Sequence, residues 1–285
     1  MSGKLEGARW RRLVRADWTK AAEDWEVREP SLLYSLSGVN PALLGALRLA
    51  PGHRVLDFGC GLGEPALEIA QWVEPRGSVL GIDVSPTMLA VARRRARSRG
   101  IANARFRRAD IARFDSGGAR FDAVVARYGI MFVDDVPRAL AGLRRALKPG
   151  GRVALAVWAE AARNPYFGLA PTALRAYLPA PAADPEHVPH PLRFGRRALL
   201  PRLLREAGFR SVRSREVRVP FVYTDPESCA RTVLEATSIA RSLPRPLTRA
   251  QRRAVFASLV REVKRYRDGA LVRVPAVARV VSAVR

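Results

Sequence analysis

The sequence predicts an α/β fold built on a doubly wound, mainly parallel sheet, and two observations favour this class. Throughout residues 52–160, apolar runs short enough for strands alternate with segments that have helical periodicity. The first apolar run, Val55-Leu56, leads into an acid, a glycine-rich turn and then a helical pattern. Alternation of this kind is typical of parallel strands whose connecting helices cover both faces of one sheet.

The turn residues predict where the individual helices begin and end. Ser85 is expected to cap the helix after the second strand, with Pro86 in its first turn and Gly100 at its end. A later helix starts after Asp135 and ends before the turn at Pro149-Gly150-Gly151. The strands are expected at 54–58, 78–82, 104–109, 121–126 and 152–158.

The glycine-rich turn after the first strand has the features of a ligand site. Gly59, Gly61 and Gly63 follow the acid Asp57 at alternate positions, and Pro65 comes soon after them. Glycine lets the backbone turn sharply and lets a ligand lie against bare main chain. Proline suits the first turn of the following helix, whose free N–H groups face the ligand.

Two classes of ligand use such a turn. A dinucleotide site needs the pattern G-x-G-x-x-G/A and an acid about 20 residues later. Gly61, Gly63, Ala66 and Asp83 satisfy that pattern, so the fingerprint alone leaves this alternative open. Asp57 argues against it, because a carboxylate beside the turn disfavours a pyrophosphate and favours a cationic ligand.

The pattern Asp57-x-Gly59-x-Gly61-x-Gly63 resembles the first motif of class I S-adenosylmethionine-dependent methyltransferases. The resemblance is closest to the small-molecule branch that modifies ubiquinone and menaquinone. Four further motifs of the family follow in the expected order: VLGIDVSPTML (79–89), RRADIARF (107–114), FDAVVARYGIMFVDD (121–135) and LRRALKPGGRVALAVW (143–158). The resemblance implies a Rossmann-like, seven-stranded sheet and S-adenosyl-L-methionine as cofactor.

The resemblance also implies which residues bind this cofactor. The turn with Asp57 would hold the methionine part, Asp83 the ribose hydroxyls, and Asp110 with Ile111 the adenine amino group. Each acid has a structural alternative: Asp57 as a partner of turn N–H groups, Asp83 as a helix cap and Asp110 as a turn acid. The full expected set is Asp57, Gly59, Cys60, Gly61, Gly63, Asp83, Val84, Met88, Asp110, Ile111 and Arg127.

The acceptor side of the site carries fewer signals. In the family, the loop after the fourth strand faces both cofactor and acceptor, and here it begins at Arg127. It lacks the Asn/Asp-Pro-Pro-aromatic motif of DNA and protein amino methyltransferases, and Asn164-Pro165-Tyr166 follows the fifth strand instead. Direct displacement needs no metal. The catalytic residue stays open, and the candidates for a general base are Tyr128, Tyr166, His187 and His190.

The chain divides into three expected parts. Helical spacing of Trp18, Ala21, Ala22 and Trp25 marks the first, which the resemblance implies to be a lid. A last strand near 280–284 is expected to complete the sheet. The parts are a helical lid (1–50), a cofactor-binding core (51–160) and a C-terminal part (161–285) with helices at 226–243 and 248–267 in a substrate cap over about 225–267.

Composition limits the class of protein. With 285 residues and 48% hydrophobic content, the chain can bury a large core. It has no apolar run of about 18 residues, and its first residues lack the apolar centre of a signal peptide. Cys60 and Cys229 have no C-x-x-C partner, which argues against a disulfide framework or a zinc site. We therefore expect a cytoplasmic protein.

The formal net charge of +24 has two interpretations. Arginine abounds together with alanine, proline, glycine and valine, as expected of a GC-rich genome. A surface this basic also attracts polyanions at low salt. The densest cluster, RRRARSR at 93–99, falls on the helix after the second strand. No aromatic residues interleave it, as a stacking platform for single-stranded nucleic acid requires.

The sequence therefore predicts a methyltransferase, monomeric or homodimeric, that acts on a small apolar or aromatic acceptor such as a quinol, a polyketide or another secondary metabolite. Two alternatives stay open. One is the same enzyme acting on RNA or another polyanion. The other is a non-catalytic ligand-binding module on the same fold.

Overall fold

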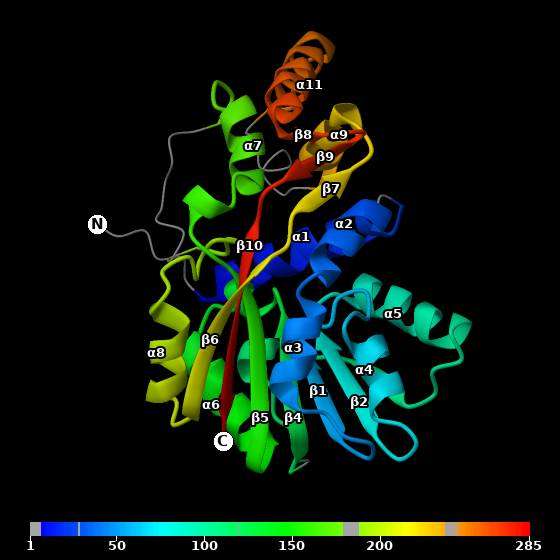
Figure 1. Ribbon diagram of the computed structural model, residues 1–285, viewed down its shortest axis with the longest axis vertical. Helices are drawn as coiled ribbons and strands as arrows, with labels where there is room; N and C mark the ends of the chain where they lie inside the picture. The colour runs from blue at the N-terminus through cyan, green and yellow to red at the C-terminus, as the bar shows by residue number, and fades with distance from the viewer. Residues whose placement is uncertain (1–6, 28, 119, 179–187, 237–242, 244) are drawn as a thin grey trace.

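A seven-stranded sheet forms the centre of the molecule and confirms the predicted α/β class. Figure 1 shows the computed structural model, which describes residues 7–27, 29–118, 120–178, 188–236, 243 and 245–285. The strand order is β3-β2-β1-β4-β5-β10-β6, and β10 alone runs antiparallel to its two neighbours, β5 and β6. The strands are β1 (Arg54–Phe58), β2 (Ser78–Asp83), β3 (Ala104–Arg108), β4 (Phe121–Arg127), β5 (Leu147–Trp158), β6 (Arg210–Arg218) and β10 (Val277–Val284).

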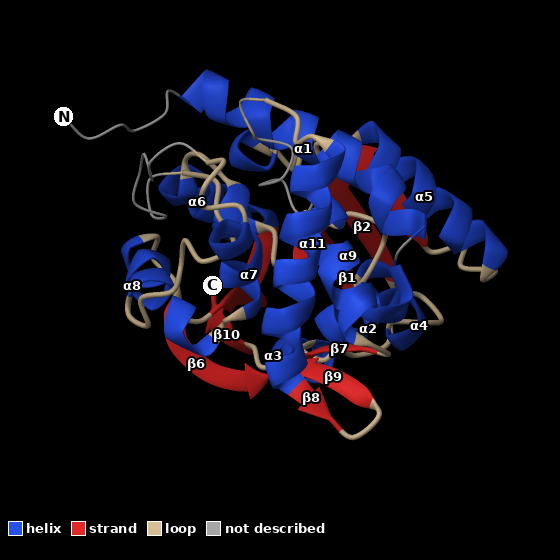
Figure 2. Cartoon of the chain, turned by 90° about the horizontal axis from the view of Figure 1, so that it is seen from above, coloured by secondary structure: helices blue, strands red, loops and turns tan. Residues whose placement is uncertain are grey.

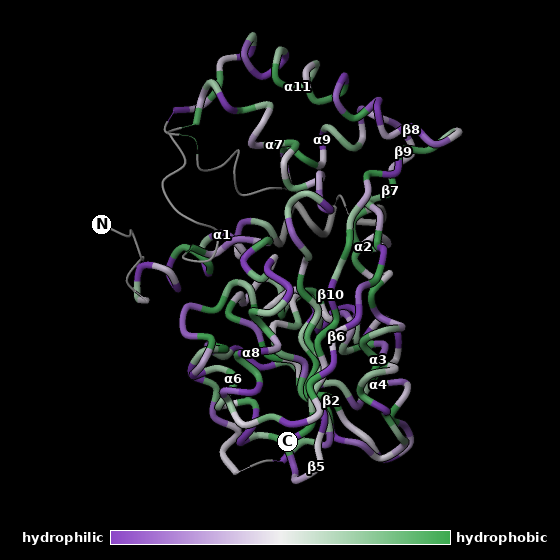
Figure 3. The backbone as a smooth tube through the Cα atoms, turned by 60° about the vertical axis from the view of Figure 1, so that its left-hand side comes forward, coloured by the Kyte–Doolittle hydropathy of each residue, from purple (hydrophilic) through white to green (hydrophobic). Residues whose placement is uncertain are grey.

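The central strands are apolar on both faces because helices cover both sides. In β4, Ala123, Val124, Val125 and Ala126 are all 0% exposed. In Figure 3 the tube is largely green where the strands run side by side next to the label β10. Figures 1 and 2 show α3, α4 and α5 on one face and α6 and α8 on the other. These helices are α3 (Asn40–Leu47), α4 (Ala66–Trp72), α5 (Pro86–Ser98), α6 (Val136–Ala146) and α8 (Leu199–Glu206).

Two helices at the N-terminus lie apart from these layers. α1 (Gly7–Val27) contacts α5, and α2 (Glu29–Ser37) contacts the short strand β7 (Phe221–Tyr223). α3, which falls in the segment expected to be a lid, instead packs against β4, β5 and β10. Its apolar side chains Leu43 and Leu47 are buried in the same core as the sheet. Within the segment expected to be a lid, α3 is therefore part of the layer that covers the sheet.

A smaller layer continues from the carboxyl end of β5 and stands above the sheet in Figure 1. It contains a three-stranded antiparallel sheet of order β7-β9-β8, which the sequence did not predict. The helix expected at 248–267 ends at Val263, and a short 3-10 turn then leads into β8. The elements of this layer are α7 (Tyr166–Ala173), β7 (Phe221–Tyr223), α9 (Pro226–Ala236), α11 (Arg249–Val263), β8 (Arg267–Asp268) and β9 (Leu271–Val274).

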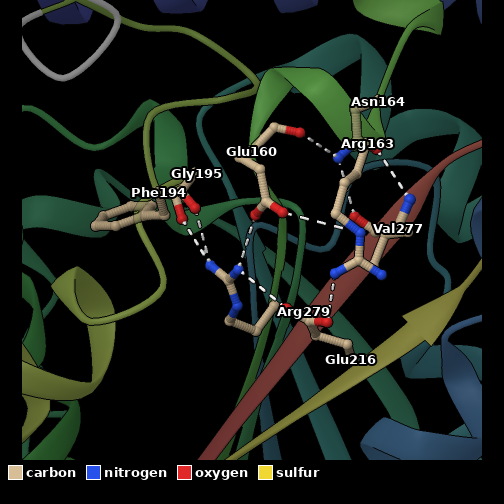
Figure 4. Close-up of polar contacts among 8 residues, drawn as sticks. All are labelled: Glu160, Arg163, Asn164, Phe194, Gly195, Glu216, Val277 and Arg279. Atoms are coloured by element: carbon tan, nitrogen blue, oxygen red, sulfur yellow. Dashed lines mark hydrogen bonds and ion pairs between the residues drawn. The ribbon is translucent and has the colours of Figure 1, made fainter.

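A buried arginine on β10 connects β6 with the segment that follows β5. The side chain of Arg279, on β10, is 1% exposed and forms ion pairs of 3.2 Å with both Glu160 and Glu216 (Figure 4). Its Nη1 donates to the carbonyl oxygens of Phe194 and Gly195 at 3.2 and 3.1 Å. Because a buried charge is costly unless it is paired and hydrogen-bonded, these partners account for an arginine inside the fold.

Asn164 makes a second connection at the same place. Its Oδ1 accepts the N–H of Val277 at 3.0 Å, and its Nδ2 donates to the carbonyl of Val277 at 3.2 Å. Arg163 also donates to Glu216 at 2.5 Å, which links the segment after β5 to β6 (Figure 4). This polar junction fixes where the upper layer leaves the sheet.

None of the described helices is long and apolar enough to cross a bilayer.

Candidate active site

A cavity of about 750 Å³ lies between the loops at the carboxyl ends of β1 to β4 and the helices α1 and α2. Its volume falls in the usual range for small-molecule sites, about 300–1,000 Å³. Most of the residues expected from the sequence line it: Gly59, Cys60, Gly61, Asp83, Val84, Met88, Asp110, Ile111, Arg127 and Tyr128. Asp57 and Gly63 do not line it.

The glycine turn lets two loops meet under the cavity. Gly59 and Gly61 have φ angles of +80° and +50°, which residues other than glycine rarely adopt. A Cβ on Gly59 would lie 3.3 Å from the Cα of Gly129, in the loop after β4. Gly63 has a φ of +105° and packs instead against Leu67 and Ala92. Its contribution in the structure is therefore to the packing of α4 against α5.

Asp57 is fully buried beneath this turn. Its Oδ2 accepts the N–H of Ala66 at 3.1 Å, while Oδ1 has no hydrogen-bond partner among the described residues. Burial raises the pKa of Asp57 to about 7, against the opposing effect of the Arg127 charge. The hydrogen bond to Ala66 agrees with the structural alternative, in which Asp57 binds N–H groups of the turn. Oδ1 remains a buried acceptor without a partner among the described residues.

Asp83 ends β2 and receives two backbone hydrogen bonds. Its Oδ2 accepts the N–H of Gly61 at 3.0 Å, and its Oδ1 accepts that of Ser85 at 2.9 Å. Burial raises the pKa of Asp83, and these N–H groups oppose the rise. The cap of α5 is Ser85, as predicted, because its Oγ accepts the N–H of Met88 at 3.3 Å. Asp83 thus braces the turn and also faces the cavity.

Asp110 follows β3 and caps a 3-10 turn, Ile111–Arg113. Its Oδ1 accepts the N–H of Ala112 at 3.0 Å, which is the turn role foreseen as the alternative. Its Oδ2 lies 3.6 Å from Nε of Arg11, on α1. Asp110 therefore has a structural role and a position on the cavity wall at the same time.

Arg127 ends β4 on the opposite side of the turn. Its Nη1 donates to Oδ1 of Asn40 at 3.2 Å. Burial lowers its pKa, although the surrounding acids and Tyr128 oppose this effect. The guanidinium stays charged, because even a lowered arginine pKa lies far above neutral pH. The charge of Arg127 opposes the rise in the pKa of the buried Asp57.

The candidate bases are placed very differently. Tyr128 lines the cavity, with a φ of 58° and a buried hydroxyl that has no partner among the described residues. Burial raises its pKa above the ordinary value. Tyr166 lies on α7, away from the cavity, and its hydroxyl is 2.9 Å from that of Tyr223. Burial lowers the pKa of His190, which does not line the cavity, and His187 lies outside the described residues.

Arg11, Leu36 and Asp134 line the cavity but were not identified from the sequence. Trp18 and Arg11 on α1 and Leu36 on α2 line it, opposite Phe132 and Asp134. The rings of Trp18 and Phe132 pack edge to face with centroids 5.0 Å apart. Trp18 was recognised by its helical spacing, but nothing in the sequence indicated that Arg11 and Asp134 meet.

Comparison with known proteins agrees with the fold and with the motifs. Residues 55–151 match the family described as a methyltransferase domain. A 2-phytyl-1,4-naphtoquinone methyltransferase of Synechococcus elongatus is 41% identical over 108 residues, which are 37% of this chain and 46% of that protein. The aklanonic acid methyltransferase DauC of a Streptomyces species is 38% identical over 103 residues, 36% of this chain and 47% of that protein.

Among solved structures, the YcgJ protein of Bacillus subtilis has a TM-score of 0.56 at 19% identity, over 88% of this chain and 97% of that one. At this identity the likeness shows the fold, which is that of the class I methyltransferases. The chain spans about half the length of the curated relatives that it matches. Residues 55–151 thus match the methyltransferase domain family, and about 108 residues of the chain are similar to a quinone-modifying methyltransferase.

Proposed function

We propose that this protein is an S-adenosylmethionine-dependent methyltransferase that acts on a small aromatic or apolar acceptor. The observation that carries the proposal is the convergence of the glycine turn, Asp83 and Asp110 on one cavity within the matched domain. Similarity to enzymes named for a naphthoquinone and for aklanonic acid favours a quinol or a polyketide as acceptor.

The cavity residues suit the parts of this cofactor. Asp83 retains lone pairs for ribose hydroxyls, since an ionised carboxylate has about four acceptor sites and the backbone uses two. Asp110 would accept from the adenine amino group beside the apolar side chain of Ile111. Val84 and Met88 would pack against the ribose and the ring, and Cys60 leaves room beside Gly59 and Gly61.

The methionine part is assigned to the other side of the turn. Oδ1 of Asp57 is buried and has no hydrogen-bond partner among the described residues, so it can accept from a donor near the turn. The cationic amino group of the methionine part would be this donor, either past Gly59 or through a bridging water. Arg127 supplies the opposite charge for a carboxylate. When bound, the cofactor supplies a methyl group on a positively charged sulfur.

The residues of this chain would act mainly by positioning. The acceptor atom must lie in line with the methyl group, and a closed cavity that holds both partners and excludes water supplies much of the rate. α1, α2 and the upper layer that follows β5 would form the lid and the substrate cap. The raised pKa of Tyr128 keeps its phenol neutral, so this residue would donate a hydrogen bond to the acceptor rather than take its proton.

A transfer assay with a labelled methyl donor tests the proposal. Naphthohydroquinones, aromatic polyketides and RNA are offered in parallel, with the Asp83→Ala variant and an Asp115→Ala control, whose exposed acid does not line the cavity. We expect the label to appear in a small aromatic product. The Asp83→Ala variant should lose this transfer, and the Asp115→Ala control should keep it. Label in RNA alone supports the polyanion alternative, and cofactor binding without any transfer supports the non-catalytic module.

A further inference from the structure

Arg11 connects the helix above the cavity to two acids on its walls. Its Nε lies 3.6 Å from Oδ2 of Asp110, and its Nη1 donates to Oδ2 of Asp134. Asp110 belongs to the loop after β3 and Asp134 to the loop after β4. The planar guanidinium can reach two carboxylates at once, which a lysine ammonium on its flexible stem does less well.

The neighbouring Trp10 holds α1 in the position that this bridge needs. Its indole is 3% exposed, and its Nε1 donates to the carbonyl oxygen of Phe132 at 2.8 Å. The guanidinium of Arg193 lies over the ring at 4.6 Å and donates to the carbonyl oxygen of Val133. α1 is therefore attached to the loop after β4 by both of these consecutive residues, Trp10 and Arg11.

The bridge determines how Asp110 is presented to the cavity. The N–H of Ala112 donates to Oδ1, and the Arg11 guanidinium lies 3.6 Å from Oδ2, so each carboxylate oxygen faces a partner. Its side chain is 35% exposed, and without Arg11 the hydrogen bond from Ala112 would be its one remaining polar contact among the described residues. Loss of Arg11 would also leave Asp134, whose side chain is 8% exposed, without the counter-charge given by Arg11.

We propose that Arg11 is a positioning residue that couples closure of α1 to recognition of the exocyclic amino group of adenine. Arg11 does so by orienting the Asp110 carboxylate. This carboxylate accepts a hydrogen bond from the amino group of adenine, and it repels the carbonyl oxygen that replaces the amino group in a deaminated base. This inference rests on the proposed cofactor. It adds that the lid helix, and not only the sheet loops, sets the choice of base.

The test compares two ligands that differ at that group: S-adenosyl-L-homocysteine and its deaminated analogue S-inosyl-L-homocysteine. Calorimetry measures the affinity of each for the wild type, Arg11→Gln, Arg11→Lys and the control Arg9→Gln. Arg9 is exposed on the same helix and does not line the cavity. Glutamine keeps much of the length of the side chain but removes the charge.

In the wild type and in Arg9→Gln, we expect the adenine ligand to bind more tightly than the inosine ligand. In Arg11→Gln this ratio falls about tenfold, chiefly because the adenine ligand binds more weakly. Arg11→Lys restores part of the ratio. An equal loss for both ligands, or no loss, overturns the proposal while leaving the cofactor assignment intact. Failure of the wild type to bind S-adenosyl-L-homocysteine overturns the proposed function itself.

Discussion

Tyr128 lies flat against Trp158, with ring centroids 4.2 Å apart and an interplanar angle of 4°. Tyr128 forms part of the cavity wall, and Trp158 is the last residue of β5. Trp158 in turn contacts Phe221, whose ring stacks on Tyr166 with centroids 3.7 Å apart. One aromatic stack therefore runs from the cavity into the upper layer, so packing in that layer supports the shape of the site.

Trp158→Ala removes the middle of this stack. The side chain is 3% exposed, so we expect a cost of about 3–5 kcal/mol in the free energy of unfolding. Urea denaturation measures it. The matched control is Trp72→Ala, because Trp72 is 62% exposed and its loss should cost at most about 0.5 kcal/mol. Equal costs for both variants would contradict a structural role for the stack.

Tyr128→Phe removes a buried hydroxyl that has no partner among the described residues. Because no internal hydrogen bond is lost, stability should stay within about 1 kcal/mol of the wild type. The phenol is neutral near pH 7, since burial raises its pKa, so the pH dependence of methyl transfer should not change. A rate that rises with pH in the wild type and loses this rise in the variant would show that Tyr128 acts as a base after all.

Asp57 should make the stability of the ligand-free protein depend on pH. Its pKa rises from 3.8 to about 7 on burial, so the folded state keeps the proton to a higher pH than the unfolded chain. Stability is therefore lost as the pH rises from about 4 through 7. Asp57→Asn removes this loss and should be more stable than the wild type at pH 8, by on the order of 3 kcal/mol, with little difference near pH 4. Denaturation at both pH values checks this, and a gain that is independent of pH would count against it.

The junction at Arg279 should matter more than any exposed ion pair. Arg279→Ala removes the donor to the carbonyl oxygens of Phe194 and Gly195 and one ion-pair partner from each of two acids, and we expect a loss of about 3 kcal/mol. Arg202→Ala, which breaks the exposed pair with Glu206, should cost less than about 0.5 kcal/mol. Thermal unfolding of the two variants compares them, and similar midpoints would mean that Arg279 does not stabilise the junction of β10, β6 and the segment after β5.

The parts of the fold that were predictable depend on neighbours in the chain. The Asp57 to Gly63 turn, Ser85 as a cap and the strand before Asp83 all follow from short-range patterns, and the structure agrees with each. The seven-stranded sheet, expected from the family resemblance, is also present.

The parts that were not predictable depend on residues far apart in the chain. Arg11 meets Asp134 across 123 positions, and one arginine among so many carries no signal for such a pairing. Strands β7, β8 and β9 are 2–4 residues long, too short for a periodic pattern. The sequence of α3 predicts a helix but not what the helix packs against. Its contacts with β4, β5 and β10 distinguish it from a lid helix.

The measurement that tests the proposed cofactor most directly is calorimetric titration with S-adenosyl-L-methionine, S-adenosyl-L-homocysteine and NAD. We expect micromolar binding of the first two, none of NAD, and a loss of at least about tenfold in Asp83→Ala with no change in Asp115→Ala. Binding of NAD in place of the other two, or full affinity for S-adenosyl-L-homocysteine in Asp83→Ala, would contradict the assignment of this site.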